Sequence, residues 1–259
     1  ARKLVERGAD VQAADDEGWT PLMYALRYEL QDVALLLLDK GARVNERNKN
    51  GWSPLHFALR NNGTRAARRL IEAGADLGRT TSDGWTPLLT ALRNDQGENA
   101  RLLVEKGVDP DAKNQDGWTP LMMALRYDQG ECARLLAQKC KQLDEKDKDG
   151  WTALTFALRY GHPEAAATLL QRGAAFNYTV EGGWEPLLTA LRYGQAENAR
   201  KLIQKGANPK AKTDQGWSAL MFAIEHDQPE NARLLIEKGA DPAVQSSAAI
   251  TRSPSFSRS

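Results

Sequence analysis

The stretch Gly117-Trp118-Thr119-Pro120-Leu121 decides the fold, because close variants of it recur along the chain at a constant spacing. Each copy begins 33 residues after the one before it, as the step from Gly84 to Gly117 shows. The seven copies begin at Gly18, Gly51, Gly84, Gly117, Gly150, Gly183 and Gly216. A fixed period of this length indicates a repeat architecture, in which each copy is one supersecondary unit that packs against its neighbours.

Within one period the residues predict two short helices. In the fourth copy Thr119 suits an N-cap, and Pro120 suits the first helical position, where its missing N–H costs nothing. Asp128-Gln129-Gly130 interrupts this helix, and a second helix is expected from about Glu131. In most copies a glycine closes the second helix, as the left-handed C′ position prefers. These glycines are Gly41, Gly74, Gly107, Gly173, Gly206 and Gly239.

The period and its motifs resemble the ankyrin repeat, whose pattern is Gly-x-Thr-Pro-Leu, then Ala, then Leu-Leu and Gly-Ala-Asp. The resemblance implies an all-α fold, an ankyrin-repeat solenoid of paired antiparallel helices with short β-hairpin-like turns. It divides the chain into the second half of a truncated repeat (1–14), seven repeats of 33 residues (15–245) and a Ser/Arg-rich tail (246–259). The composition of the tail predicts flexibility.

The chain departs from the family pattern in three ways. The histidine that follows Thr-Pro-Leu is retained only as His56, so the threonine–histidine hydrogen bond of the family is expected to be mostly lost. Leucine replaces the second alanine of the usual Ala-Ala pair, as at Leu92. The fourth repeat closes with Cys140-Lys141, where Gly-Ala is usual.

Cys140 therefore either adopts a strained left-handed conformation or sends the chain along another path. With strain, replacing Cys140 by glycine is expected to stabilise the protein by about 0.5–1 kcal/mol. Its thiol is expected to be more exposed than that of Cys132, which falls on the apolar stripe of a helix.

Composition and charge exclude several classes of protein. The chain is 41% apolar and 27% charged, which is typical of a folded chain, and its formal net charge is only +1. No stretch approaches the roughly 18 uninterrupted apolar residues of a membrane span. Two cysteines are too few for a disulfide framework, which favours the cytoplasm, with the nucleus as the alternative compartment.

No catalytic motif is recognisable. The phosphate-binding loop, the Gly-x-Ser-x-Gly elbow, His-Glu-x-x-His and Cys-x-x-Cys are all missing from the sequence. His56, His162 and His226 occupy different positions of different repeats, so they are not expected to converge on a metal ion. We therefore predict a chain that is not an enzyme, with no catalytic residue, no metal and no cofactor.

Three residue types recur at fixed positions. Tryptophan follows the glycine in every copy, arginine comes eight residues later in six copies, and tyrosine follows that arginine in four. The ankyrin resemblance implies that these positions line the concave groove, outside the packing between repeats, and such residues dominate binding hot spots. We call this set the ladder. Its candidate partner-binding residues are Trp19, Trp52, Trp85, Trp118, Trp151, Trp184, Trp217, Arg27, Arg60, Arg93, Arg126, Arg159, Arg192, Tyr28, Tyr127, Tyr160 and Tyr193.

Three functions for the ladder stay open. It can bind a protein or extended peptide, an acidic one being one option, in a scaffold that is expected to be monomeric and away from membranes. It can bind a polyanion such as single-stranded nucleic acid by stacking, although Glu17, Asp83 and Asp116, each two residues before a tryptophan, disfavour this. Or it can stack only on itself, as cation–π pairs worth about 0.5–1 kcal/mol each, in an architectural spacer.

Overall fold

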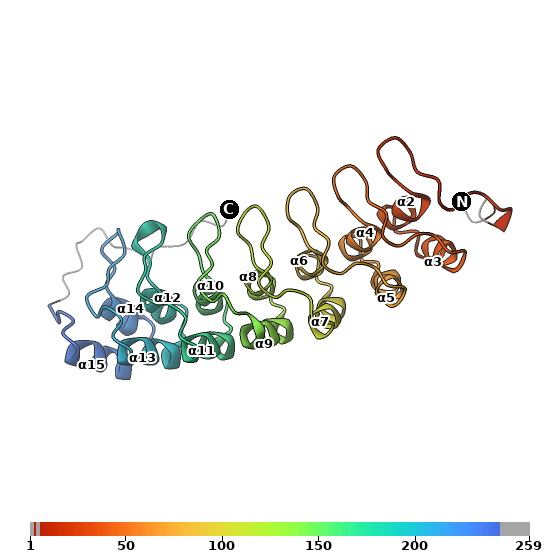
Figure 1. Ribbon diagram of the computed structural model, residues 1–259. Helices are drawn as coiled ribbons and strands as arrows, with labels where there is room; N and C mark the ends of the chain where they lie inside the picture. Colours follow the sequence, from red (N-terminus) through yellow and green to blue (C-terminus); the bar gives the residue numbers. More distant parts are fainter. Residues whose placement is uncertain (1–2, 4–5, 244–259) are drawn as a thin grey trace. The chain divides into compact units, whose positions relative to one another are not determined.

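The computed structural model describes residue 3 and residues 6–243, and the helices among them follow one another in pairs (Figure 1). The tail 246–259 lies outside the described residues, as does part of the truncated repeat 1–14. The regular secondary structure of the described residues is α-helical, apart from the short 3-10 helix η1 (Glu181–Gly183) and two isolated β-bridges. The predicted all-α fold of paired, stacked helices is confirmed.

Each pair consists of a shorter first helix and a longer second helix. The first helices are α2 (Pro21–Arg27), α4 (Pro54–Arg60), α6 (Pro87–Arg93), α8 (Pro120–Arg126), α10 (Ala153–Arg159), α12 (Pro186–Arg192) and α14 (Ala219–Glu225). The second helices are α3 (Gln31–Asp39), α5 (Thr64–Glu72), α7 (Gly97–Glu105), α9 (Gly130–Lys139), α11 (Pro163–Gln171), α13 (Ala196–Gln204) and α15 (Pro229–Glu237).

The chain divides into two compact units, residues 1–141 and 142–259. In the first unit α2, α4, α6 and α8 pack in series, and α3, α5, α7 and α9 do the same beside them. In the second unit α10, α12 and α14 form one series, and α11, α13 and α15 form the other. In each unit the hairpins project on one side of the first helices and the second helices lie on the other side (Figure 1).

The predicted signals at the start of the first helix are confirmed. Thr119 is the N-cap of α8, and its hydroxyl oxygen accepts a hydrogen bond from the backbone N–H of Met122 at 3.3 Å. Pro120 occupies the first turn. The helix ends at Arg126, Asp128 takes a positive φ of 55°, and α9 begins at Gly130. The turn Asp128-Gln129-Gly130 thus separates the two helices as the sequence indicates.

The hairpins hold consecutive repeats together and explain one glycine of the motif. Gly84 has a φ of +80°, and a Cβ there would lie 3.0 Å from the Cα of Asn114 in the next hairpin. The backbone N–H of Gln115 donates to the carbonyl oxygen of Asp83 at 3.1 Å, again from one hairpin to the next. Glycine is therefore required both for the left-handed backbone and for the close approach of the neighbouring chain.

The prediction of a strained left-handed backbone at Cys140 is wrong. Gly107, at the equivalent position, has a φ of +80°, but Cys140 has a φ of −58° and a ψ of 142°, which is ordinary extended backbone. The chain takes the other path: the N–H of Cys140 donates to the carbonyl of Leu136, and the N–H of Lys141 donates to the Asp111 carboxylate at 2.9 Å. Cys140 is also buried rather than exposed, so its side chain contributes to packing.

We therefore expect Cys140→Gly to destabilise the protein by about 1–2 kcal/mol, because it removes a buried side chain and frees the unfolded backbone. Chemical denaturation of the variant and of the wild-type chain measures this difference. An unchanged or higher midpoint would contradict this view of the Cys140 backbone, and Gln138→Ala, an exposed change two residues earlier, is the control.

Candidate functional site

Two tryptophans of the ladder, Trp19 and Trp184, pack against a phenylalanine of the next repeat. Each tryptophan of the ladder stands between a hairpin and the N-cap of a first helix, and the backbone N–H of Trp118 is fixed by the Asn114 side chain at 3.0 Å. Phe57 of α4 lies between two indoles, with its ring centroid 4.7 Å from that of Trp19 and 5.3 Å from that of Trp52. The expectation that the rings lie outside the packing between repeats is therefore corrected.

The second unit repeats this arrangement with deeper burial. Phe222 of α14 lies 5.4 Å from Trp184 and 5.2 Å from Trp217. Trp151, Trp184 and Trp217 are buried, at 8%, 5% and 9% exposure. The four tryptophans of the first unit are half-buried instead. The first unit thus leaves more of its indole surface accessible to a ligand.

In three repeats of the first unit an arginine lies over the indole. The guanidinium carbons of Arg27, Arg60 and Arg93 are 5.0, 5.0 and 4.9 Å from the ring centroids of the tryptophans eight residues earlier. These arginines are exposed, and among the described residues they have no ion-pair partner. A guanidinium held on a ring face keeps its N–H donors, which lie in its own plane, for another acceptor.

The arginines of the second unit are less accessible. Arg159 lies 4.9 Å over Trp151 and 5.5 Å over Tyr160, and it is half-buried. Arg192, also half-buried, donates from Nη1 to Nε2 of His226 at 3.0 Å. Glu225 occupies the arginine position of the last repeat. The cationic row is therefore strongest in the first unit.

Three of the four tyrosines of the ladder are exposed. Tyr28, Tyr127 and Tyr193 are 63%, 42% and 37% exposed, whereas Tyr160 is half-buried and stacks on Phe156 at 5.9 Å. Arg126, from the central repeats, is half-buried. The exposed side chains of the ladder are therefore tyrosines and arginines, and its indoles are half-buried or buried.

Tyr24, which is not among the recurring ladder positions, extends the aromatic surface at the first repeat. Its ring lies 5.2 Å from Trp19 and 6.4 Å from Tyr28, and its hydroxyl donates to the Asp15 carboxylate at 2.7 Å. This hydrogen bond lowers the pKa of Asp15 and raises the pKa of Tyr24. The signal was present in the sequence, because Tyr24 occupies the position of Phe57 in the next repeat.

Two polar networks lie near the tryptophans, and the first of them joins one repeat to the next. Nε2 of His56 donates to the carbonyl oxygen of Trp85 at 3.0 Å, which leaves Nδ1 as the acceptor for the Ser53 hydroxyl at 2.8 Å. Where threonine replaces this histidine, at Thr155, the phenol of Tyr178 hydrogen-bonds to it and, at 2.6 Å, to the Thr152 hydroxyl. Burial raises the pKa of Tyr178.

No metal or membrane chemistry accompanies the ladder in the part of the chain that the structure describes. Residues 3 and 6–243 contain no cluster of three histidine, cysteine or carboxylate side chains suited to a metal ion. None of the helices in this same range combines the length and apolarity needed to cross a bilayer. Burial raises the pKa of the Cys132 thiol to about 11, so this cysteine stays protonated at neutral pH.

Comparison with known proteins agrees with the geometry. The family model of ankyrin repeats, which spans three copies, matches residues 1–48, 41–114, 98–180 and 176–246. The crystal structure of the human ASB11 ankyrin repeat domain is similar, with 26% sequence identity and a TM-score of 0.63 over 87% of this chain and 100% of that one. No curated protein matches the sequence.

Because His56 is buried, the unfolding free energy of the protein is expected to depend on pH. Desolvation lowers its pKa from 6.5 to about 4, so the folded protein holds it neutral while the unfolded chain takes up a proton below pH 6.5. This contribution to stability is complete above pH 6.5 and is lost as the pH falls toward 4.

Between pH 7 and pH 5 the wild-type chain is expected to lose about 2 kcal/mol more unfolding free energy than His56→Leu, which carries the residue found at Leu89 in the next repeat. Urea denaturation at both pH values measures the two losses. Equal losses in the two proteins would show that His56 is not held neutral by burial.

Proposed function

The chain belongs to the ankyrin repeat family, and from this we propose that it is a non-catalytic scaffold that binds an extended, acidic segment of a partner protein along the ladder. Ankyrin repeat domains are generally protein-interaction modules and are typically non-catalytic.

The observation that carries the proposal is the row of stacked guanidiniums in the first unit. Arg27, Arg60 and Arg93 are exposed, held over indole faces and without a carboxylate partner among the described residues. Fixing each arginine on a ring reduces the side-chain entropy that a ligand would otherwise have to remove. A carboxylate can then bind such a guanidinium through two parallel N–H donors.

The spacing of the row suits an extended chain. Packed helices lie about 8–10 Å apart, so the arginine should recur at roughly 10 Å. An extended peptide advances about 3.3 Å per residue, so about every third residue of the partner would meet an arginine. We propose that the partner segment carries acidic residues at this interval, with its other side chains against the indoles and tyrosines.

Two other functions compete with this one. Binding of single-stranded nucleic acid would use the same aromatic stacking and the same arginines, but the carboxylates of the hairpins would repel its phosphates. One of these carboxylates, Glu17, is paired with Lys49 at 2.8 Å, which reduces its share of that repulsion. An architectural spacer would need only the packing of Trp19 and Trp52 on Phe57, and that packing leaves the exposure of Arg27, Arg60 and Arg93 unexplained. The cytoplasmic or nuclear location and the absence of a cofactor remain predictions from the sequence.

The test compares two triple variants with equal changes of charge. Arg27, Arg60 and Arg93 are changed to alanine in one, and Arg101, Arg134 and Arg200, which pair with glutamates of their own second helices, in the other. The probe is a fluorescein-labelled peptide of twelve residues with glutamate at every third position. We expect the ladder variant to bind it at least about 30-fold more weakly, as hot-spot truncation of about 2 kcal/mol requires, while the control binds normally.

Thermal melting of both variants separates binding from folding. Equal loss of affinity in the two variants would show that the peptide responds only to the net charge of the protein. Unchanged affinity in the ladder variant would refute binding of the peptide along the ladder. Labelled oligothymidine is measured in parallel over a range of salt concentrations. Tighter binding of oligothymidine than of the peptide, with a steep salt dependence, would favour the polyanion function instead.

A further inference from the structure

The ring contacts of the first unit limit the interval at which the ladder recurs. Phe57 lies 4.7 Å from Trp19 and 5.3 Å from Trp52, so these two indole centroids are no more than about 10 Å apart. Packed helices do not approach much closer than about 8 Å. Arg27 and Arg60 each lie 5.0 Å over the indole of their own repeat, so the guanidiniums should recur at the same interval of about 8–10 Å.

The same three repeats carry a second row of donors. The backbone N–H groups of Trp19, Trp52 and Trp85 donate to side chains of their own hairpins. Within the part of the chain that the structure describes, their indole N–H groups have no acceptor, and the rings are half-buried. An indole N–H only donates, so a ligand must bring the acceptor. Each of these repeats therefore presents a guanidinium to an acid and an indole N–H to a carbonyl oxygen.

A β-strand does not match this interval. Its successive side chains point to opposite faces, so the side chains on one face recur at about 6.6 Å and again at about 13 Å. The third residue along a strand reaches about 10 Å, but its side chain points away from the ladder. A strand with glutamate at every third position would therefore miss the middle arginine of the row Arg27, Arg60 and Arg93 if it met the other two.

A polyproline-II helix matches the interval. It has three residues per turn and rises 3.1 Å per residue, so every third side chain returns to the same side after about 9.3 Å. Its backbone makes no internal hydrogen bonds, which leaves its carbonyl oxygens able to accept from the indoles of Trp52 and Trp85. An α-helix returns to the same side after seven residues, or about 10.5 Å, but its carbonyl groups are already bonded within the helix.

Charge and ring surface specify which residues such a ligand carries. Arg27, Arg60 and Arg93 are exposed, so the side chain that faces them in each turn should be glutamate or aspartate. The half-buried indoles add apolar ring surface, and grooves lined by aromatic rings bind proline-rich segments in this conformation. Proline fixes φ near −65°, so a proline-rich ligand loses less conformational entropy on binding.

We propose that the segment bound by the ladder is a polyproline-II helix with an acidic residue at every third position and proline between them. This inference rests on the proposed function, because it specifies the conformation and the sequence of the acidic segment. The acidic side chains lie against the arginines of α2, α4 and α6, and carbonyl oxygens of the segment accept from the indoles of the same repeats. About seven residues of the segment are enough to reach all three arginines.

Fluorescence anisotropy with four labelled peptides, each carrying four glutamates, tests the proposal on the full chain. The first consists of four Glu-Pro-Pro triplets. The second has the same composition, but its glutamates alternate with single prolines and the other prolines follow. The third replaces every proline of the first by glycine, and the fourth is a helical peptide with glutamate at every seventh position. The first should bind at least about tenfold more tightly than each of the others, because it alone combines the matching interval, free carbonyls and a preformed conformation.

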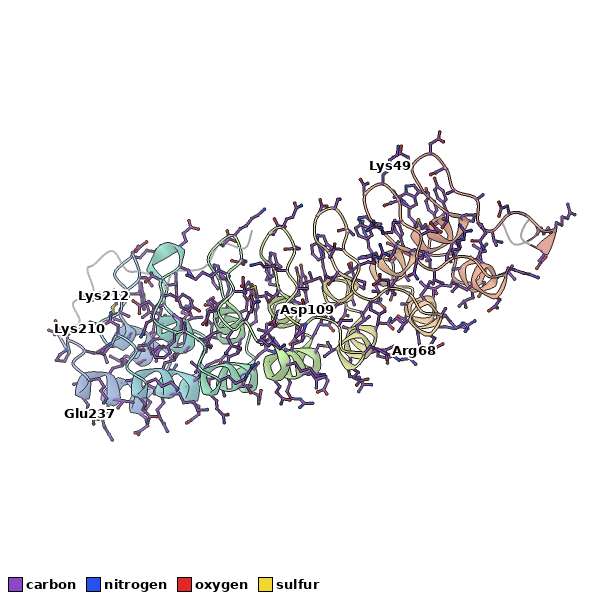
Figure 2. The ribbon with its side chains drawn as sticks, viewed as in Figure 1. Lys49, Arg68, Asp109, Lys210, Lys212 and Glu237 are labelled. Carbon is purple, nitrogen blue, oxygen red and sulfur yellow. The ribbon has the colours of Figure 1, made fainter. Side chains whose placement is uncertain are left out.

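Two protein variants show where the first peptide binds. Alanine in place of Arg27, Arg60 and Arg93 should abolish its advantage over the second peptide. Arg68→Ala is the control, because Arg68 lies on α5, on the side away from the hairpins (Figure 2), where it pairs with Glu98 at 3.5 Å. This control should bind the first peptide as the wild-type chain does.

The outcomes separate this inference from the proposed function. Equal affinity for the first and second peptides, or tighter binding of the helical peptide, overturns the inference; the proposed function stands if that binding still needs the three ladder arginines. If no acidic peptide binds at the ladder, both are overturned. In NMR spectra the indole N–H resonances of Trp52 and Trp85 should move when the first peptide binds, and unmoved resonances in the bound protein also overturn the inference.

Discussion

None of the helices between residues 6 and 243 is long enough to be stable alone, so the fold is stable only through the packing of neighbouring repeats. The first helices have seven residues and the second helices nine or ten, whereas isolated helices below about 12–15 residues are marginal in water. Burial of Leu59, Leu92 and Leu125 between repeats supplies what the helices lack. This requirement fixes the period, because an inserted residue would shift every contact that follows.

The ladder is a consequence of the same packing. Trp19 packs against Phe57 of the next repeat, and in four repeats an arginine lies over the ring of the tryptophan. Arg60 rests on such a ring, and its position is set by Trp52 rather than by a carboxylate. The fold thus presents cations in a fixed row without neutralising them, and that is the physical basis for proposing an acidic, extended partner.

The sequence predicts the local features that recur in every repeat, such as helix caps and turns. It does not predict features that depend on contacts between one repeat and another. The N-cap at Thr119 and the turn at Asp128 follow from local rules, and both are confirmed. The path at Cys140 is accompanied by a hydrogen bond from the backbone N–H of Lys141 to the carboxylate of Asp111, thirty residues before Lys141, which no local pattern reveals. For the site, the sequence identified the three recurring positions. It could not show that Trp217 is buried and Arg27 exposed, because those exposures are set by side chains of adjacent repeats.

Whether tryptophan holds arginine in place for an acidic ligand can be measured by NMR of the arginine side chains. The Nε–H resonances of Arg27, Arg60 and Arg93 should be displaced by the ring currents of their indoles, and they should move further when the glutamate peptide is added. Arg134, which pairs with Glu131 at 2.9 Å, is the internal reference and should not move. Undisplaced resonances for the three ladder arginines would show that the indoles do not hold them. Equal movement of the Arg134 resonance would show that the peptide does not bind selectively at the ladder.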